Sequence, residues 1–187
     1  MPACRIPPLQ ALYPFGGSVL RILVTDNTAD KYLPDMINAA RSAGSILLNH
    51  FHKRENLQIT HKTASDFVSQ ADLEAESCIQ RILLAAWPRF GIRLEEGGLI
   101  TGSDQRWQWI VDPLDGTTNF IRGIPHFAVS IGLAFEGVPV AGVVFSPLQD
   151  ELFSAAIRHG AFLNNRQIRC ADTTALPAML LGTGFPF

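Results

Sequence analysis

Apolar residues recur every three or four positions from residue 33 to residue 51, and this spacing predicts an amphipathic helix of about five turns. Pro34 fits within its first turn, where a missing backbone donor costs nothing. The polar segment from residue 59 to residue 72 predicts a loop. A second helix should follow this loop and end at Pro88. Its inward-facing residues are Leu73, Ile79, Ile82, Leu83 and Ala86.

The later part of the chain has the pattern of strands. The apolar run from Trp107 to Val111 is typical of a buried strand, which we expect to end at Asp112 because Pro113 has no backbone donor. Apolar segments separated by turns then predict an antiparallel meander over residues 127–135, 138–145, 152–157 and 161–163. Both faces are mostly apolar, so this sheet should be covered on both sides, one of them by the two helices. The predicted fold class is α+β, with two helices packed on a largely antiparallel sheet.

The composition of the chain excludes some classes of function. With 47% hydrophobic and 17% charged residues in 187, the chain is long and apolar enough for one domain with a real core. The net charge of -2 and the scattered basic residues argue against direct nucleic-acid binding. The 3 cysteines lie far apart and favour neither a disulfide framework nor a zinc site, which indicates a cytoplasmic protein. No apolar stretch approaches the roughly 20 residues that span a membrane.

Residues 1–31 differ from the rest of the chain. Prolines and glycines interrupt every apolar run there before it reaches the length of a signal peptide, so we expect no export signal. A strand at residues 20–24 is the one element that the segment suggests. In this interpretation residues 1–31 are a poorly ordered N-terminal extension, and residues 32–187 form one α+β unit without a flexible linker.

Two carboxylates, Asp112 and Asp115, follow the central apolar run and lead into Gly116. Asp-Pro and Asp-Gly pairs also form ordinary turns, so a turn without chemistry is an alternative at this point. Gly116 permits a close approach of the backbone to a ligand, and the residues after it are types that cap helices, so amides here could face an anion. The segment thus offers carboxylates for a metal and amides for a phosphate.

The residues from Trp109 to Phe120 are Trp-Ile-Val-Asp-Pro-Leu-Asp-Gly-Thr-Thr-Asn-Phe. This run closely resembles the signature of the inositol monophosphatase family, which are magnesium-dependent, lithium-sensitive phosphatases. The resemblance covers residues 32–187. It implies the layered αβαβα sugar-phosphatase fold, of which this chain would be the front half, with the C-terminal half absent.

The resemblance also implies roles for individual residues. The implied metal ligands, for two or more Mg²⁺ ions, are Glu95, Asp112, Asp115 and the backbone carbonyl of Leu114, with Asp112 shared between ions. The implied catalytic residues are Glu95, Thr117 and Asp72, of which Asp72 and Thr117 orient the attacking water. The implied substrate-binding residues are Lys62, Leu114, Asp115, Gly116 and Thr117.

The residues alone leave other interpretations open at two of these positions. Asp72 follows Ser69 by three residues, as in a helix capping box, and Glu95 begins a Glu-Glu-Gly-Gly segment that is typical of a solvated loop. The sequence also departs from the family pattern, because Ser69 stands where threonine is usual and the spacing from Lys62 to Asp66 is one residue shorter.

The function implied by the resemblance is hydrolysis of a phosphate monoester by metal-activated water, without a covalent phosphoenzyme. The Thr-Thr-Asn-Phe ending at residues 117–120 favours a myo-inositol phosphate substrate. Fructose 1,6-bisphosphate, histidinol phosphate and 3'-phosphoadenosine 5'-phosphate are alternative substrates. A non-catalytic interaction protein is an alternative of another class, since some bacterial relatives act in transcription complexes, and a homodimer is compatible with the resemblance.

Overall fold

The computed structural model describes residues 29–53, 59–61, 67–171 and 177. Its helical elements are η1 (Ala29–Tyr32), α3 (Leu33–His52), α4 (Gln70–Ala86) and α5 (Thr117–Arg122). The two predicted helices are therefore confirmed as α3 and α4. Ile79 and Leu83 of α4 are buried as predicted and Ile82 is half-buried, whereas Leu73 is 45% exposed and Ala86 is exposed, so these two do not face inward. The predicted strand at residues 20–24 and the extension up to residue 28 lie outside the described residues. Among the described residues, no helix combines the length and apolar character needed to cross a membrane.

The segment predicted as a loop contains regular structure. Strands β1 (Ile59–His61) and β2 (Phe67–Ser69) pair antiparallel, and α4 begins directly after β2. Asp72 therefore lies in the first turn of a helix rather than in a loop. The prediction failed because polar side chains do not prevent backbone pairing, and strand preference depends more on the partner than on the residue itself.

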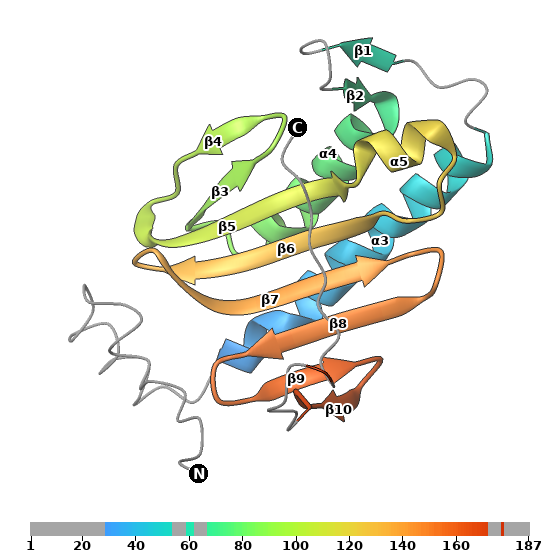
Figure 1. Ribbon diagram of the computed structural model, residues 1–187. Coiled ribbons are helices and arrows are strands. Elements are labelled where there is room, and N and C mark those ends of the chain that lie inside the picture. The colour runs from blue at the N-terminus through green and yellow to red at the C-terminus, as the bar shows by residue number, and fades with distance from the viewer. Residues whose placement is uncertain (1–28, 54–58, 62–66, 172–176, 178–187) are drawn as a thin grey trace.

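Eight strands form the main sheet, in the order β10-β9-β8-β7-β6-β5-β3-β4 (Figure 1). They are β3 (Phe90–Leu94), β4 (Gly98–Ile100), β5 (Asp104–Asp115), β6 (Ala128–Phe135), β7 (Val138–Ser146), β8 (Glu151–Ala156), β9 (Gly160–Leu163) and β10 (Arg166–Ile168). Strands β3 and β5 are parallel, and the other neighbours are antiparallel. The largely antiparallel sheet is confirmed, whereas β3, β4 and β10 were not predicted.

Helices α3 and α4 pack on one face of this sheet (Figure 1). The core between them includes Met36, Leu47, Ile79, Leu83, Trp109, Ile131 and Leu133, all at most 1% exposed. Contact is tight at Gly44 of α3, where an added β-carbon would lie 2.5 Å from Cε1 of Phe145 on β7. A small residue is thus required where this helix crosses the sheet.

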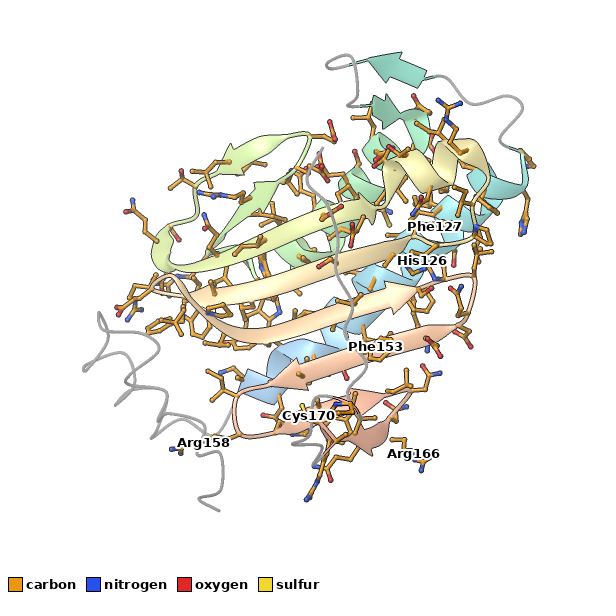
Figure 2. The ribbon with its side chains drawn as sticks, in the orientation of Figure 1. His126, Phe127, Phe153, Arg158, Arg166 and Cys170 are labelled. Carbon is orange, nitrogen blue, oxygen red and sulfur yellow. The ribbon has the colours of Figure 1, made fainter. Side chains whose placement is uncertain are left out.

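The opposite face of the sheet is apolar and exposed in the described part of the chain. Ile110, Val144 and Phe153 are between 38% and 44% exposed. Val144 is paired with Phe153 across β7 and β8, so their side chains lie on the same face. Phe153 is labelled on β8 in Figure 2. The predicted covering of both faces is therefore found on one face only among the described residues.

Strand β5 continues through Pro113, so the prediction that it ends at Asp112 is wrong. Asp112 is paired with Ser130 and Asp115 with Ala128, so the step along β5 is one residue longer than the step along β6. This is a β-bulge, and proline is tolerated there in an interior strand because no ladder bond is needed from it. The bulge places both carboxylates within a sheet instead of on a loose loop.

Candidate functional site

The parallel pairing of β3 and β5 brings two acidic residues together. Leu94, the last residue of β3, is paired with Val111 of β5. The residues that follow this pair, Glu95 just beyond β3 and Asp112 within β5, therefore lie near the carboxyl ends of these two parallel strands, and a side-chain hydrogen bond joins the two. The pattern of the sequence does not predict this contact, because the contact depends on strand β3, which the pattern does not reveal.

The bulge in β5 sets the orientation of Asp115. In a regular strand, residues three positions apart point to opposite faces. Ser130 and Ala128, however, are two positions apart on β6 and share a face, so their partners Asp112 and Asp115 share a face too. Leu114 between them is 1% exposed. The extra residue of the bulge thus turns the second carboxylate to the side of the first.

Gly116 makes the turn from β5 into α5. Its φ of 93° and ψ of 35° are left-handed, and an added β-carbon would lie 3.0 Å from the carbonyl oxygen of His126. Glycine is required here for both reasons. The N-cap of α5 is Gly116 itself, without a side-chain capping bond, and Figure 2 shows His126 and Phe127 between α5 and β6.

Thr117 links the turn to helix α4. Its hydroxyl oxygen lies 2.9 Å from the carbonyl oxygen of Leu114 and 3.4 Å from Oδ1 of Asp72. Asp72 is 1% exposed, so this carboxylate is buried against the turn. A threonine hydroxyl has one proton to donate, and of its two contacts the shorter one, to Leu114, is the stronger hydrogen bond.

Burial and the neighbouring acidic side chains change the pKa of Asp112. Burial, followed by the charge and hydrogen bond of Glu95 and the charge of Asp115, raises the pKa of Asp112 to about 8. The backbone N–H of Leu114 donates to Oδ1 of Asp112 over 3.1 Å and acts in the opposite direction. Carboxylates held this close repel one another when ionised, and a bound cation would relieve the repulsion.

The donor set fits a hard cation. All of the candidate ligands are oxygen atoms, which suit Mg²⁺. The set contains no thiolate or imidazole, the ligands that favour zinc. Within the described ranges, however, no three His, Cys, Asp or Glu side chains are already gathered at metal-site spacing. Glu95 and Asp112 form a close pair, whereas Asp115 is exposed and points to the same side without joining them.

Glu76 is a buried acid that the sequence interpretation did not single out. It is 6% exposed, and its Oε2 accepts a hydrogen bond of 2.8 Å from the backbone N–H of Glu96. The backbone N–H of Gly97 donates to the same carboxylate. Burial raises the pKa of Glu76, and these two bonds oppose the rise. Its spacing of four residues from Asp72, which places both on one helical face, was the available signal.

A cavity of about 370 Å³ adjoins the turn. Asp115 and Gly116 line it together with polar side chains, including Asn119, His126 and Ser146, and with the apolar side chains of Phe127, Ala128, Val144 and Phe153. The volume lies within the range of about 300–1,000 Å³ typical of small-molecule sites. A larger hollow of about 500 Å³ lies on the outer surface of α3 and α4 and contains none of the residues described above.

Comparison with known proteins assigns the chain to a family. The model of the inositol monophosphatase family matches residues 29–187. The chain belongs to this family. Its inositol monophosphatase-type architecture agrees with the predicted α+β sugar-phosphatase fold class, which is thereby confirmed.

Relatives within the inositol monophosphatase family are close in sequence and structure. The chain is 48% identical over 151 residues to an inositol-1-monophosphatase of Rhizobium meliloti, covering 81% of this chain and 57% of that protein. It is 47% identical over 150 residues to the Nus factor SuhB of Xylella fastidiosa, covering 80% and 54%. The crystal structure of the extragenic suppressor protein suhB from Bartonella henselae matches with a TM-score of 0.73 at 47% identity, covering 74% and 54%. The chain therefore spans a little more than half the length of these relatives.

The structure brings most of the residues implied by the family resemblance into two small groups. Glu95 and Asp112 form one group, and Asp72, Leu114 and Thr117 form the other. The bulge connects the groups, because Asp112 and Leu114 lie on either side of Pro113. Asp115 and Gly116 follow directly after Leu114 in the bulge and the turn, and Lys62 lies outside the described residues.

Proposed function

We propose that this chain forms the metal- and water-binding part of a magnesium-dependent phosphate monoester hydrolase of the inositol monophosphatase type. The observation that carries the proposal is the placement of Glu95 beside Asp112, with Asp115 turned to the same face by the bulge. A phosphate ester is already anionic, so neutralisation of charge is the first requirement for attack on it. A set of oxygen ligands that repel one another without a cation is suited to that task.

Each of these residues has a definite part in the proposed site. The carboxylates of Glu95, Asp112 and Asp115 would hold magnesium, with Asp112 shared between two ions. Leu114 would add its backbone carbonyl, which has a second lone pair beside the one that accepts the Thr117 hydroxyl. When bound, such ions lower the pKa of a coordinated water and neutralise phosphate oxygens.

The protein's own groups would orient the nucleophile and the phosphate. The hydroxyl of Thr117 donates a hydrogen bond to the carbonyl of Leu114 or to the carboxylate of Asp72. Its oxygen lone pairs can therefore accept a hydrogen bond from the attacking water. The first amides of a helix have no intrahelical partner. Those of Gly116 and Thr117 at the start of α5 would therefore donate to phosphate oxygens, with Lys62 as a further substrate contact.

The proposed substrate is a myo-inositol phosphate, which is hydrolysed to myo-inositol and phosphate. The 48% identity to a protein named inositol-1-monophosphatase supports this choice. The cavity beside Asp115 is lined in part by amide, imidazole and hydroxyl groups, which can bond the hydroxyls of a polyol, and in part by apolar side chains, which can contact its ring carbons. A panel that includes fructose 1,6-bisphosphate, histidinol phosphate and 3'-phosphoadenosine 5'-phosphate tests it, because much faster hydrolysis of one of these would assign a different substrate.

An interaction protein is the second candidate. Relatives of 46–47% identity carry the name Nus factor SuhB, and the exposed apolar face around Val144 and Phe153 is of the kind that associates with other proteins. This candidate predicts capture of a partner without turnover. The metal ligands would then be dispensable for binding of that partner.

Substitution of Asp112 separates the two candidates. We expect Asp112→Asn to abolish magnesium-dependent phosphate release. Asp104→Asn, at the other end of β5, is the control, because Asp104 pairs with Arg106 and lies away from the site. Equal activity in both variants would contradict the proposal, and partner capture that survives Asp112→Asn without any turnover in the parent would favour the interaction protein.

Calorimetric titration with Mg²⁺ tests which residues are metal ligands. Glu95→Gln and Asp115→Asn should each weaken binding, because each removes one anionic ligand from a partly shielded site. Unchanged affinity in both variants would remove these two residues from the proposed site.

A further inference from the structure

The buried carboxylate of Glu76 contacts the segment that bears Glu95. It accepts the backbone N–H groups of Glu96, over 2.8 Å, and of Gly97. Burying a carboxylate is costly unless hydrogen bonds compensate, and here the compensation comes from two consecutive amides of one turn. The bond to Glu96 lies one residue beyond Glu95, so a shift of this turn would move Glu95 directly.

The turn fits closely over Glu76. A β-carbon added at Gly97 would lie 3.0 Å from Oε1 of Glu76 and 3.0 Å from Cδ1 of Leu94. Leu94 is itself 4% exposed at the end of β3. The turn is therefore held from two sides, by the carboxylate of α4 and by the last core side chain of its own strand.

The same face of α4 holds the other half of the site. Asp72 lies four residues before Glu76, about one turn or 6 Å along the helix at 1.5 Å per residue. Asp72 contacts Thr117, which also bonds the carbonyl of Leu114. Two carboxylates one turn apart on one rigid helix thus contact the two chain segments that carry the proposed ligands.

We propose that Glu76 is a positioning residue that fixes Glu95 relative to Asp112 and Thr117, with α4 setting the spacing between the two segments. This inference rests on the proposed function, since it assigns Glu76 a role in that site. Glu76 itself touches neither metal nor substrate in this proposal. Its effect passes through the backbone of Glu96 and Gly97.

The test compares Glu76→Gln with Glu74→Gln in the 187-residue chain. Both substitutions remove one carboxylate from α4, but Glu74 pairs with His50 and Gln70 on the exposed side of the helix. An amide side chain keeps one acceptor oxygen and places a donor where the second N–H points. We expect Glu76→Gln to weaken Mg²⁺ binding about tenfold or more in calorimetric titrations, as for residues that orient metal ligands. Glu74→Gln should stay within about twofold of the parent.

Hydrogen exchange supplies a readout that does not depend on the metal. The amides of Glu96 and Gly97 should exchange faster in Glu76→Gln than in the parent, at a temperature where both are folded. Gly97→Ala crowds the same contact, 3.0 Å from Oε1 of Glu76, without changing the carboxylate, and provides the test if Glu76→Gln does not fold. Folded variants that bind Mg²⁺ as tightly as the parent would overturn the proposal.

The outcomes also separate this inference from the proposed function. Parent binding that is lost in Glu95→Gln but unchanged in Glu76→Gln and Gly97→Ala would refute the role of Glu76 alone. Parent binding that is equally strong in Glu95→Gln would refute the proposed metal site, and the role of Glu76 with it.

Discussion

The hydroxyl of Thr117 lies 3.4 Å from the carboxylate of Asp72, although 45 residues separate them in the sequence. Its shorter contact, 2.9 Å, is with the carbonyl of Leu114 three residues earlier. One proton serves both acceptors, so the hydroxyl can exchange between a local turn bond and a bond to α4. These two acceptors hold the Thr117 hydroxyl between the turn and α4.

Substitution of Thr117 should therefore affect catalysis through its hydroxyl. We expect Thr117→Val, which is similar in shape but lacks the hydroxyl, to lower kcat by about 100-fold or more, within the range for loss of a proton-transfer or water-orienting group. Thr117→Ser should retain most activity. Mg²⁺ affinity should change little in either variant, and steady-state kinetics together with calorimetry would show this. Equal kcat for the valine and serine variants would show that the hydroxyl has no such part.

The titration of Asp112 should make the metal-free protein less stable as pH rises. Its pKa is about 8 in the folded chain against an ordinary value of 3.8, so the folded state binds more protons than the unfolded state between these limits. The free energy of unfolding then falls as pH rises from about 4 to about 8. Urea unfolding in EDTA at pH 5 and pH 8 measures the fall, which Asp112→Asn should reduce.

Asp104→Asn is the matched control for this pH dependence. The hydrogen bond from Arg106 lowers the pKa of Asp104 to about 2, so its contribution is already complete above about pH 4 and is lost only in more acidic solution. The difference between pH 5 and pH 8 should therefore persist in Asp104→Asn. An identical difference in the parent and in Asp112→Asn would contradict the assignment.

Gly116→Ala should destabilise the fold more than Gly137→Ala. Both glycines have left-handed φ values, 93° and 80°, so each alanine costs about 1–2 kcal/mol in backbone strain. An added β-carbon at Gly137 meets no atom within 4 Å, whereas at Gly116 it lies 3.0 Å from the carbonyl oxygen of His126. The excess cost at Gly116, measured by urea unfolding, reports that contact. Equal costs would show that the turn can relax away from His126.

The exposed sheet face should promote self-association of the 187-residue chain. Val144 and Phe153 are adjacent across β7 and β8 and are 42% and 38% exposed. We expect Val144→Thr with Phe153→Ser to reduce association in sedimentation velocity experiments, because both remove apolar surface from one patch. Val144→Ile, which keeps the patch apolar, is the control. A monodisperse parent monomer at the same concentration would refute this expectation.

Local sequence patterns predicted the elements that bury one face. The three- to four-residue spacing in α3 and α4 and the alternation in β6 to β8 follow directly from which side chains contact the core. The turn at Glu136 and Gly137 was also predicted, and both residues have positive φ values as such turns require. These features depend on neighbours in the sequence and can be recognised there.

Features that depend on distant partners were missed. The pairing of β3 with β5, which sets Glu95 beside Asp112, needs a parallel register that no local pattern specifies. The bulge at Pro113 follows from the pairing of β5 with β6, whereas the local chemistry of proline favoured a strand end. Glu76 looked like an ordinary helical acid, and its two backbone partners lie about 20 residues away. The family resemblance named candidate residues, but only the sheet register explains why they meet.

The bulge also makes the length of β5 more critical than its composition. Asp112 and Asp115 face the same way because one extra residue lies between them, and deletion of Pro113 would restore the two-residue alternation of an ordinary strand. Asp115 would then stay on the face of Asp112, but the backbone at Leu114, whose N–H donates to Asp112 and whose carbonyl accepts from Thr117, would be drawn into the regular ladder. Changes of side chain at this point can be graded, but the loss of one residue from the chain would alter both hydrogen bonds of Leu114 at once.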